Sequence, residues 1–264
     1  MIEILKEHIV YRSQIIKLAW FDVVKTYKGT VFGWIWMLIK PLITIFVYWF
    51  AFTYGLKSGK SVNGFPYIIW LISGIIPWFF MSDILSTGIN CLKKNSYLVN
   101  KIKFPLSVIP TFDTISKFIT HIVLIGLFTI IYAFGFGIDI YFLQFPLIVL
   151  LFFLYWNIFS LGASFLSAIS RDFYNLVKSF TTAVFWLSGI MWPISNINNP
   201  IINTILLINP VTFFAQCYRK VFVYKEWIWA DSKTLLIFVL VFIFTLLFSK
   251  FVYFKTKDEV GDVI

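Results

Sequence analysis

The sequence predicts an all-α membrane protein with six transmembrane helices. Of the 264 residues, 60% are hydrophobic and only 13% are charged, whereas water-soluble domains carry about a quarter charged residues. Six stretches are long and apolar enough to cross a bilayer. A helix-periodic segment before the first span and a proline-broken apolar segment before the last one complete the pattern. They predict an N-terminal interfacial helix and two short re-entrant helices.

The N-terminal segment, residues 1–30, has the pattern of an amphipathic helix. Apolar side chains recur at helical spacing, with a break at Arg12 and Ser13, and polar side chains fill the other face. Because a span follows almost at once, we expect this helix to lie in the membrane interface rather than in a soluble domain. No short apolar region with a small-residue cleavage site is present, so we expect no cleavable signal peptide.

Residues 31–264 are expected to form the transmembrane domain. A span needs about 20 apolar residues, and prolines are tolerated within spans because neighbouring groups satisfy the freed backbone. The predicted spans are residues 31–56, 66–89, 105–135, 142–169, 175–194 and 234–254.

The distribution of lysine and arginine predicts that both termini are cytoplasmic. With the N-terminus inside, the cytoplasmic segments hold twelve of these residues and the outer segments hold six, as the positive-inside rule requires. We therefore attribute the net charge of +10 to basic loops that set the membrane topology. No basic stretch with interspersed aromatic residues indicates a nucleic-acid partner. This orientation places Cys91 and Cys217 on opposite sides, so we expect no disulfide between them.

The region 195–233 is too apolar for a free loop and too broken for a span. Pro200 and Pro210 divide it into two short helices, each with an apolar side. Two helices that dip into the outer leaflet fit this pattern, provided that protein or a cavity shields their backbone. The alternative is a peripheral hairpin on the membrane surface.

No nucleotide-binding or catalytic motif is complete in this chain. GLKSGKS, from Gly55 to Ser61, has three residues between its first Gly and Gly-Lys, where a P-loop has four. We expect a short outer loop there. No HExxH, GxSxG or paired-carboxylate pattern occurs, so no catalytic residue and no metal ligand is assigned. His8 and His121 are expected to pack or to form hydrogen bonds.

Charged side chains inside predicted spans should face protein or water, because each would cost several kcal/mol facing lipid. Asp113 and Lys117 are four residues apart on one helix face, so we expect them to form an ion pair. Lys40 and Asp83 are candidates for the translocation path.

Aromatic residues make up 21% of the chain and crowd the first two spans. Tryptophan and tyrosine are typical of membrane interfaces, and an interfacial location is enough to explain any one of these aromatic residues. Aromatic faces also stack on sugar rings, so a subset is a candidate lining for a sugar conduit. These candidates are Trp34, Trp36, Tyr48, Trp49 and Trp186.

Several stretches, in order and spacing, resemble the ABC-2 type exporter permeases of the polysaccharide and teichoic-acid group. The first is TYKGTVFGWIWMLIKPLITIFVYWFAF at 26–52, with a Tyr, a small-residue turn, Gly, an aromatic, Trp and Pro-Leu. The others are GIIPWFF at 74–80, VNKIKFPLSVIP at 99–110, RDF at 171–173 and INPVTFFAQCYRKVF at 208–222. Within this group, the run from Gly55 to Phe80 and the NKIKFPLSVIP stretch look most similar to wall teichoic acid exporter permeases.

The resemblance implies a six-helix permease subunit that works as a homodimer with two separate ATPase subunits in the bacterial cytoplasmic membrane. The implied cargo is a polymer on an undecaprenyl diphosphate lipid. No cofactor is expected on this chain, which is not an enzyme on its own, and ATP and Mg are expected in the partner ATPase. The resemblance also implies that the cytoplasmic segment 91–104 is a coupling helix that docks on that ATPase.

The coupling segment has the features that docking needs. Tyr97, Leu98 and Ile102 form a small apolar patch, which Lys101 and Lys103 flank. Pro105 ends the short helix. On the next cytoplasmic turn, Arg171 and Asp172 are candidates for a second, smaller contact.

We therefore expect an exporter of a lipid-linked glycopolymer, with wall teichoic acid as the main expectation and O-antigen or capsular polysaccharide as the alternative. More remote alternatives are an ABC-2 drug or lipid exporter, an ATP-independent flippase or ion-coupled carrier, and a membrane-embedded glycosyltransferase. The lipid diphosphate is expected to meet basic residues of the N-terminal helix. These residues are Arg12, Lys17, Lys25 and Lys28.

Overall fold

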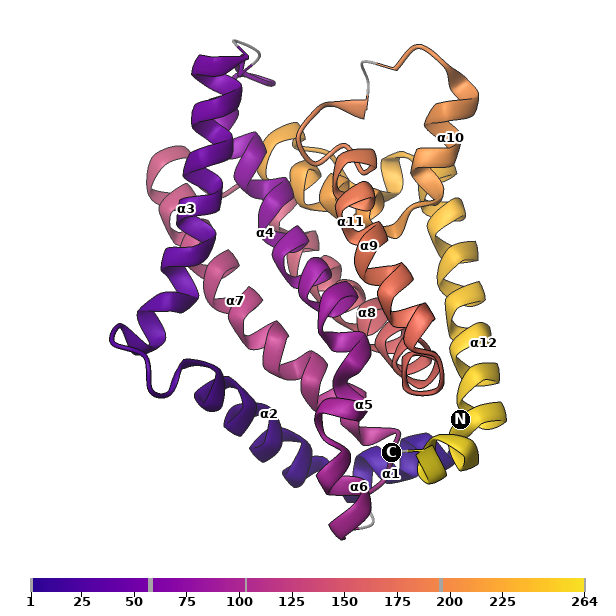
Figure 1. Ribbon diagram of the computed structural model, residues 1–264. Helices are drawn as coiled ribbons and strands as arrows, with labels where there is room; N and C mark the ends of the chain where they lie inside the picture. The colour runs from indigo at the N-terminus through magenta and orange to yellow at the C-terminus, as the bar shows by residue number, and fades with distance from the viewer. Residues whose placement is uncertain (1, 57–58, 103, 195–196, 264) are drawn as a thin grey trace.

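The computed structural model describes residues 2–56, 59–102, 104–194 and 197–263, with the backbone only for residues 2, 100–102, 262 and 263. This part of the chain is helical, with one isolated bridge between Val62 and Phe65. The predicted all-α membrane fold is confirmed (Figure 1). The α-helices are α1 Ile2–Val10, α2 Arg12–Tyr27, α3 Trp36–Phe50, α4 Tyr67–Ser86, α5 Cys91–Lys94, α6 Ser96–Ile102, α7 Val108–Phe136, α8 Phe145–Ile169, α9 Arg171–Leu187, α10 Pro200–Ile208, α11 Pro210–Arg219 and α12 Ser232–Val263.

Five helical segments in the described residues are long and apolar enough to cross a membrane, and they contain α3, α4, α7, α8 and α12. They match five of the six predicted spans. The sixth, predicted at 175–194, corresponds to α9, which has 17 residues and stands at the short limit of about 17 for a spanning helix. In Figure 1, α9 lies beside α4 and α8.

The bounds of α9 differ from the prediction because of its two caps. The helix begins at Arg171, since the Ser170 hydroxyl accepts a hydrogen bond from the Phe173 N–H and so caps the first turn. It ends at Leu187, because Gly189 adopts a left-handed conformation with φ of +63°. A side chain at that position would also collide with Ile194. The hydrophobic run continues past this point, but the helix does not.

The segment before the last span forms the two predicted short helices. Two Asn-Pro pairs start them: Asn199 and Asn209 accept hydrogen bonds from backbone N–H groups of the first turn, and each is followed by a proline at the first helical position. Their axes differ by 93°, counting α11 together with the turn that extends it to Tyr224. α11 is almost wholly buried and packs on α4.

The N-terminal helices α1 and α2 lie across one end of the bundle, where both termini are found (Figure 1). The chain breaks between them at Tyr11, next to the predicted break at Arg12. α2 packs on α7 through a buried face of Ile15, Ala19, Asp22 and Val23. Its other side exposes large apolar residues such as Trp20 and Phe21. This two-sided pattern suits a helix that lies in a membrane interface.

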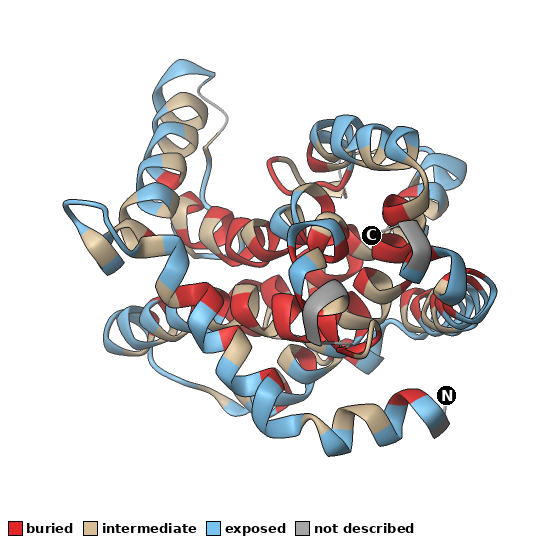
Figure 2. Cartoon of the chain, turned by 60° about the horizontal axis from the view of Figure 1, so that its bottom comes forward, coloured by how far each residue is buried: buried red, intermediate tan, exposed pale blue. Residues whose placement is uncertain are grey.

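Buried residues concentrate in the inner helices, while the outward sides of the N-terminal helices are exposed (Figure 2). α4 is the centre of the larger apolar cluster, which also includes α7, α8 and α11. In the most apolar part of the span around α4, 72% of the residues are buried, against 11% for the span around α3. Cys91 and Cys217 are both buried and free, as expected.

Candidate functional site

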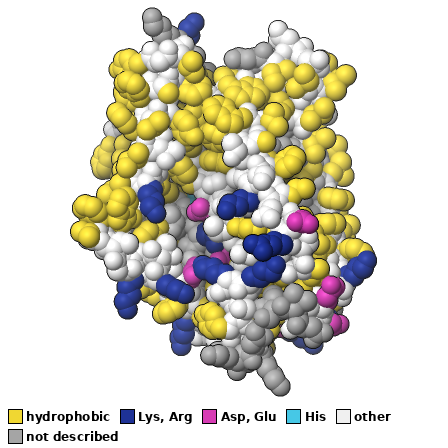
Figure 3. Space-filling view, viewed as in Figure 1, with side chains coloured by type: hydrophobic (Ala, Val, Ile, Leu, Met, Phe, Trp, Pro, Cys, Tyr) yellow, Lys and Arg dark blue, Asp and Glu magenta, His cyan; other side chains and the backbone are white. Residues whose placement is uncertain are grey.

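Two adjoining cavities lie among the interfacial helix α2, the first span and the helices α4 and α7. We call the one lined by Asp22 and Lys94, of about 200 Å³, the α2 cavity. The one lined by Trp36 and Lys40, of about 310 Å³, is the α3 cavity. In the space-filling view, charged side chains gather in the lower half of this face, beneath a mainly hydrophobic upper half (Figure 3). The cavities share Thr26, Tyr27, Asp83 and Thr120.

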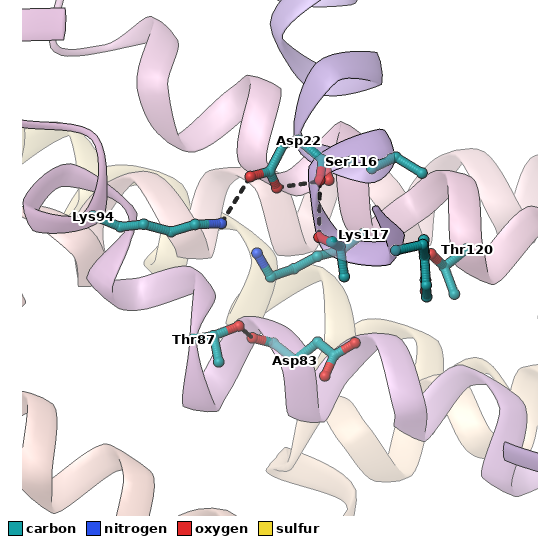
Figure 4. Close-up of a pocket in the computed structure, with 10 residues that line it drawn as sticks. Asp22, Asp83, Thr87, Lys94, Ser116, Lys117 and Thr120 are labelled. Atoms are coloured by element: carbon teal, nitrogen blue, oxygen red, sulfur yellow. Dashed lines mark hydrogen bonds and ion pairs between the residues drawn. The ribbon is translucent and has the colours of Figure 1, made fainter. Parts of the chain in front are cut away.

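Charged side chains from the four helices α2, α4, α5 and α7 meet at the α2 cavity (Figure 4). Lys94 Nζ donates a hydrogen bond of 2.9 Å to Asp22 Oδ1, and the Ser116 hydroxyl donates one of 2.9 Å to Asp22 Oδ2. Lys117 Nζ lies 2.5 Å from Asp113 Oδ2, which confirms the predicted pair. Lys94 Nζ is also 3.8 Å from Asp113 Oδ1. The network joins the interfacial helix to α5 and α7.

The ionisation of Asp22 depends on this network. Burial by itself would raise its pKa, but the hydrogen bond and the charge of Lys94 outweigh this, so the pKa lies below the usual value of 3.8. Asp22 is therefore charged at neutral pH and keeps the ion pair. The sequence alone did not reveal this contact, because Asp22 and Lys94 are 72 positions apart and each looks like an ordinary polar residue.

Asp83 projects from α4 into both cavities and is the least constrained acid of the site. In Figure 4 no dashed line reaches its carboxylate, which points to the Thr120 side of the cavity. No side chain in the described ranges donates a hydrogen bond to it or forms an ion pair with it. Lys40 lines the α3 cavity, with Nζ 5.9 Å from the centroid of the Trp36 ring. Both predicted intramembrane charges thus face a polar cavity.

A family model for ABC-2 type transporters matches residues 13–223, which includes both cavities. The chain belongs to this family. The resemblance noted from the sequence motifs is thereby confirmed at the level of the family, and the chain is the membrane permease type of subunit that such transporters use.

Named relatives of this permease are polysaccharide exporter subunits. An O-antigen export system permease protein from Myxococcus xanthus is 23% identical over 270 residues, covering 100% of both chains. An O-antigen export system permease protein from Klebsiella pneumoniae is 32% identical over 89 residues, or 34% of this chain and 33% of its own. A second match from Klebsiella pneumoniae is 27% identical over 115 residues, covering 42% and 43%.

The predicted docking patch of the permease is only partly on its surface. Tyr97 is 44% exposed, but Leu98 is 4% exposed and lies in the apolar cluster that also holds Leu92 and Phe104. The expectation that Leu98 offers an outward apolar anchor is wrong, because the short helix α6 turns this side chain toward the bundle. Three further residues were predicted to dock: Lys101, Ile102 and Lys103. The structure describes only the backbone of the first two, and Lys103 lies outside the described residues.

The start of α9 lies close to α5 at the same end of the permease. Arg171 lines a cavity of about 340 Å³ together with Asn90 and Lys93. Asp172 is exposed beside it. The two turns that the sequence analysis expected in the cytoplasm, and treated separately, therefore form one surface.

The basic residues expected to meet the lipid diphosphate do not line the two cavities. All four are exposed, three of them on α2 and Lys28 directly after it. Their side chains are thus available to the surroundings of the interfacial helix. These residues are Arg12, Lys17, Lys25 and Lys28.

The predicted path aromatics do not lie together, and only one of them lines either of the two cavities. Trp36 lines the α3 cavity, whereas Trp34 packs against Trp20 and Tyr27 of α2. Tyr48 contacts Phe185 of α9, with ring centroids 5.6 Å apart. Trp49 packs on Phe46 of the same helix and on Tyr54, which follows it. Trp186 lies on α9 and is 47% exposed.

Arg219 is a buried cation that sequence reasoning treated as a charge of the outer segment. It is completely buried in α11. Its guanidinium donates to the carbonyls of Gly189 at 2.7 Å and Ile190 at 2.5 Å, and weakly to that of Trp70 at 3.4 Å. Its Cζ lies 3.4 Å from the centroid of the Trp70 ring. Arg219 thus ties the end of α9 to α4 and α11.

Proposed function

We propose that this chain is the membrane subunit of an ABC exporter that carries a lipid-linked polysaccharide of the O-antigen type outward across the cytoplasmic membrane. The observation that carries the proposal is the full-length match to an O-antigen export permease. The motifs also resemble wall teichoic acid permeases, but the named relatives favour the O-antigen reading.

A separate ATPase supplies the energy in this proposal, since the sequence holds no complete nucleotide motif. The chain itself binds no cofactor, and ATP with Mg stays in the partner. Docking takes place at the end that carries α5, α6 and the start of α9, with Tyr97, Lys93, Arg171 and Asp172 as the contact residues. Exposure of Tyr97 and the closeness of Lys93 to Arg171 support this choice.

Two copies of the chain form the conduit. The apolar side chains of α3 and α9 that one copy leaves exposed suit a second copy, lipid and the passing polymer. Both termini lie at the ATPase end, in the cytoplasm, which agrees with the excess of lysine and arginine there. The exposed basic residues of α2 then lie at the inner leaflet, where they attract the diphosphate of the lipid carrier.

Export of a defined polymer tests this function. The permease and its co-encoded ATPase are produced in two strains, one without its own O-antigen exporter and one without its own teichoic acid exporter. We expect surface polymer to return in the first strain only, and only with an intact ATPase site. Recovery in the second strain alone would reverse the choice of cargo, and recovery without the ATPase would overturn the exporter class.

A further inference from the structure

The α3 cavity is rich in hydrogen-bond acceptors. Thr44 and Ser82 line it, and each hydroxyl donates its proton to a backbone carbonyl of its own helix, that of Lys40 or of Phe79. Thr26 does the same with the carbonyl of Asp22. These hydroxyl oxygens therefore present only lone pairs to the cavity.

The Asp83 carboxylate adds the strongest acceptor to the same cavity. An ionised carboxylate accepts hydrogen bonds only, and such charge-assisted bonds are about twice as strong as neutral ones. Among the described residues, no side chain donates a hydrogen bond to this carboxylate. A ligand that uses these acceptors must supply several donors.

A sugar ring fits these acceptors better than a cation does. Lys40 lines the α3 cavity itself, while Lys94 and Lys117 line the adjoining α2 cavity, so a bound cation would meet positive charge on both sides. Hydroxyl groups of a sugar donate without adding charge. The Trp36 ring, which also lines the cavity, offers an apolar face for the C–H side of a pyranose.

Lys40 indicates what is attached to that sugar. Its side chain is exposed, and among the described residues no carboxylate pairs with it. A lysine ammonium is a compact donor that suits a phosphate oxygen. A sugar that lies between Asp83 and Trp36 would place a phosphate on its ring within reach of this lysine.

We propose that the α3 cavity binds the sugar phosphate at the lipid-linked end of the polymer. Asp83 and Thr44 accept hydrogen bonds from the sugar hydroxyls, Trp36 packs on the ring, and Lys40 binds the phosphate. The proposal rests on the proposed export function. It adds a site that distinguishes the lipid diphosphate that carries a sugar from the one that carries none.

Binding of short-chain probes tests this site. The complex with its ATPase is reconstituted in nanodiscs and titrated calorimetrically with farnesyl diphosphate and with farnesyl diphosphate linked to glucose, galactose or N-acetylglucosamine. We expect wild type to bind at least one glycosylated probe about tenfold more tightly than farnesyl diphosphate, a difference of about 1.4 kcal/mol. Asp83→Asn and Thr44→Val should remove this preference and leave the affinity for farnesyl diphosphate unchanged. Lys40→Gln should instead lower the affinity for every probe by the same factor.

Matched variants outside the cavity serve as controls. Thr129→Val removes a hydroxyl that also donates to a carbonyl of its own helix, that of Ile125, but does not line the cavity. Asp258→Asn removes an exposed carboxylate from α12. Both should keep the sugar preference of wild type.

The outcomes separate the site from the function. If wild type exports polymer but prefers no glycosylated probe, or if Asp83→Asn keeps the preference, the sugar site is overturned and the exporter stands. A wild-type complex that restores no polymer in either export strain overturns the proposed function itself.

Discussion

Two ends of the permease stabilise positive charge in opposite ways. At the end with the termini, Lys94 and Lys117 pair with carboxylates beside open cavities. At the other end, Arg219 has no carboxylate partner in the described residues and relies on backbone carbonyls and the Trp70 ring. Side-chain pairs can re-form with other partners when helices move, but a cation held by backbone carbonyls fixes the backbone itself. We infer that the Arg219 end is the rigid one and the Lys94 end the adaptable one.

The largest effect is expected from Arg219→Leu. It leaves the carbonyls of Gly189 and Ile190 without the Arg219 donor, whereas the Trp70 carbonyl keeps the hydrogen bond from the Ser73 hydroxyl; each unsatisfied buried group costs about 1–3 kcal/mol, and the missing guanidinium leaves a cavity beside the Trp70 ring. We expect a loss of about 5 kcal/mol, seen as a lower Tm of the purified permease. The Tm of Arg219→Lys should lie between those of wild type and Arg219→Leu, because a lysine ammonium keeps the charge but lacks the planar donor fork of a guanidinium. An unchanged Tm for Arg219→Leu would show that Arg219 does not make its end of the permease rigid.

Asp113→Asn should have the next largest effect. The Asp113 side chain is completely buried and the Lys117 side chain is 11% exposed, so the variant leaves a buried ammonium without its counter-charge. Removing one partner of such a pair costs about 3 kcal/mol. Adding Lys117→Met should recover most of this Tm loss. A double variant as unstable as Asp113→Asn would show that the charges do not act as a pair.

Tyr97 and Leu98 should separate docking from folding at the adaptable end. Leu98→Ala creates a cavity in a buried apolar cluster and should lower stability by about 2 kcal/mol. Tyr97→Ala should leave the Tm unchanged and weaken co-purification of the ATPase, because this ring is exposed. The reverse pattern would place the docking surface elsewhere.

Asp22→Asn should have a smaller effect, of about 1 kcal/mol, because Lys94 is 43% exposed and its ion pair is screened by water. The expected consequence is local: α2 detaches more often from α5 and α7. Hydrogen exchange in α2 should accelerate while that around Arg219 stays the same. Equal acceleration at both ends would show that the two ends are not independent.

The smallest expected effect is a response to acid. The pKa of Asp22 is lower in the folded state than the ordinary value of 3.8, so its contribution to stability is complete above that value and is lost as the pH falls through the lowered pKa. The protection factors of the α2 amides, which remove the intrinsic pH dependence of exchange, should therefore stay constant between pH 7 and 5 as far as Asp22 determines them, and should fall only under stronger acid. The Asp22→Asn variant should lack this fall.

Much of the helix inventory could be predicted from the sequence, because apolar length and helical periodicity are local properties. The spans around α4, α7 and α8, the two Asn-Pro starts and the i,i+4 pair of Asp113 and Lys117 all follow from neighbours in the chain. The bounds of α9 could not be predicted in the same way. They depend on a serine cap and on a left-handed glycine inside a continuous apolar run, which hydrophobicity does not report.

The sequence by itself determined that this chain is a helical membrane protein of the ABC-2 type, since composition, span length and ordered motifs are written along the chain. Only the tertiary structure decided which charges meet. It joined Asp22 to Lys94 across 72 positions, turned Leu98 inward, and buried Arg219 against carbonyls of another helix end. Such contacts depend on how helices pack in three dimensions, and no periodicity within one helix encodes them.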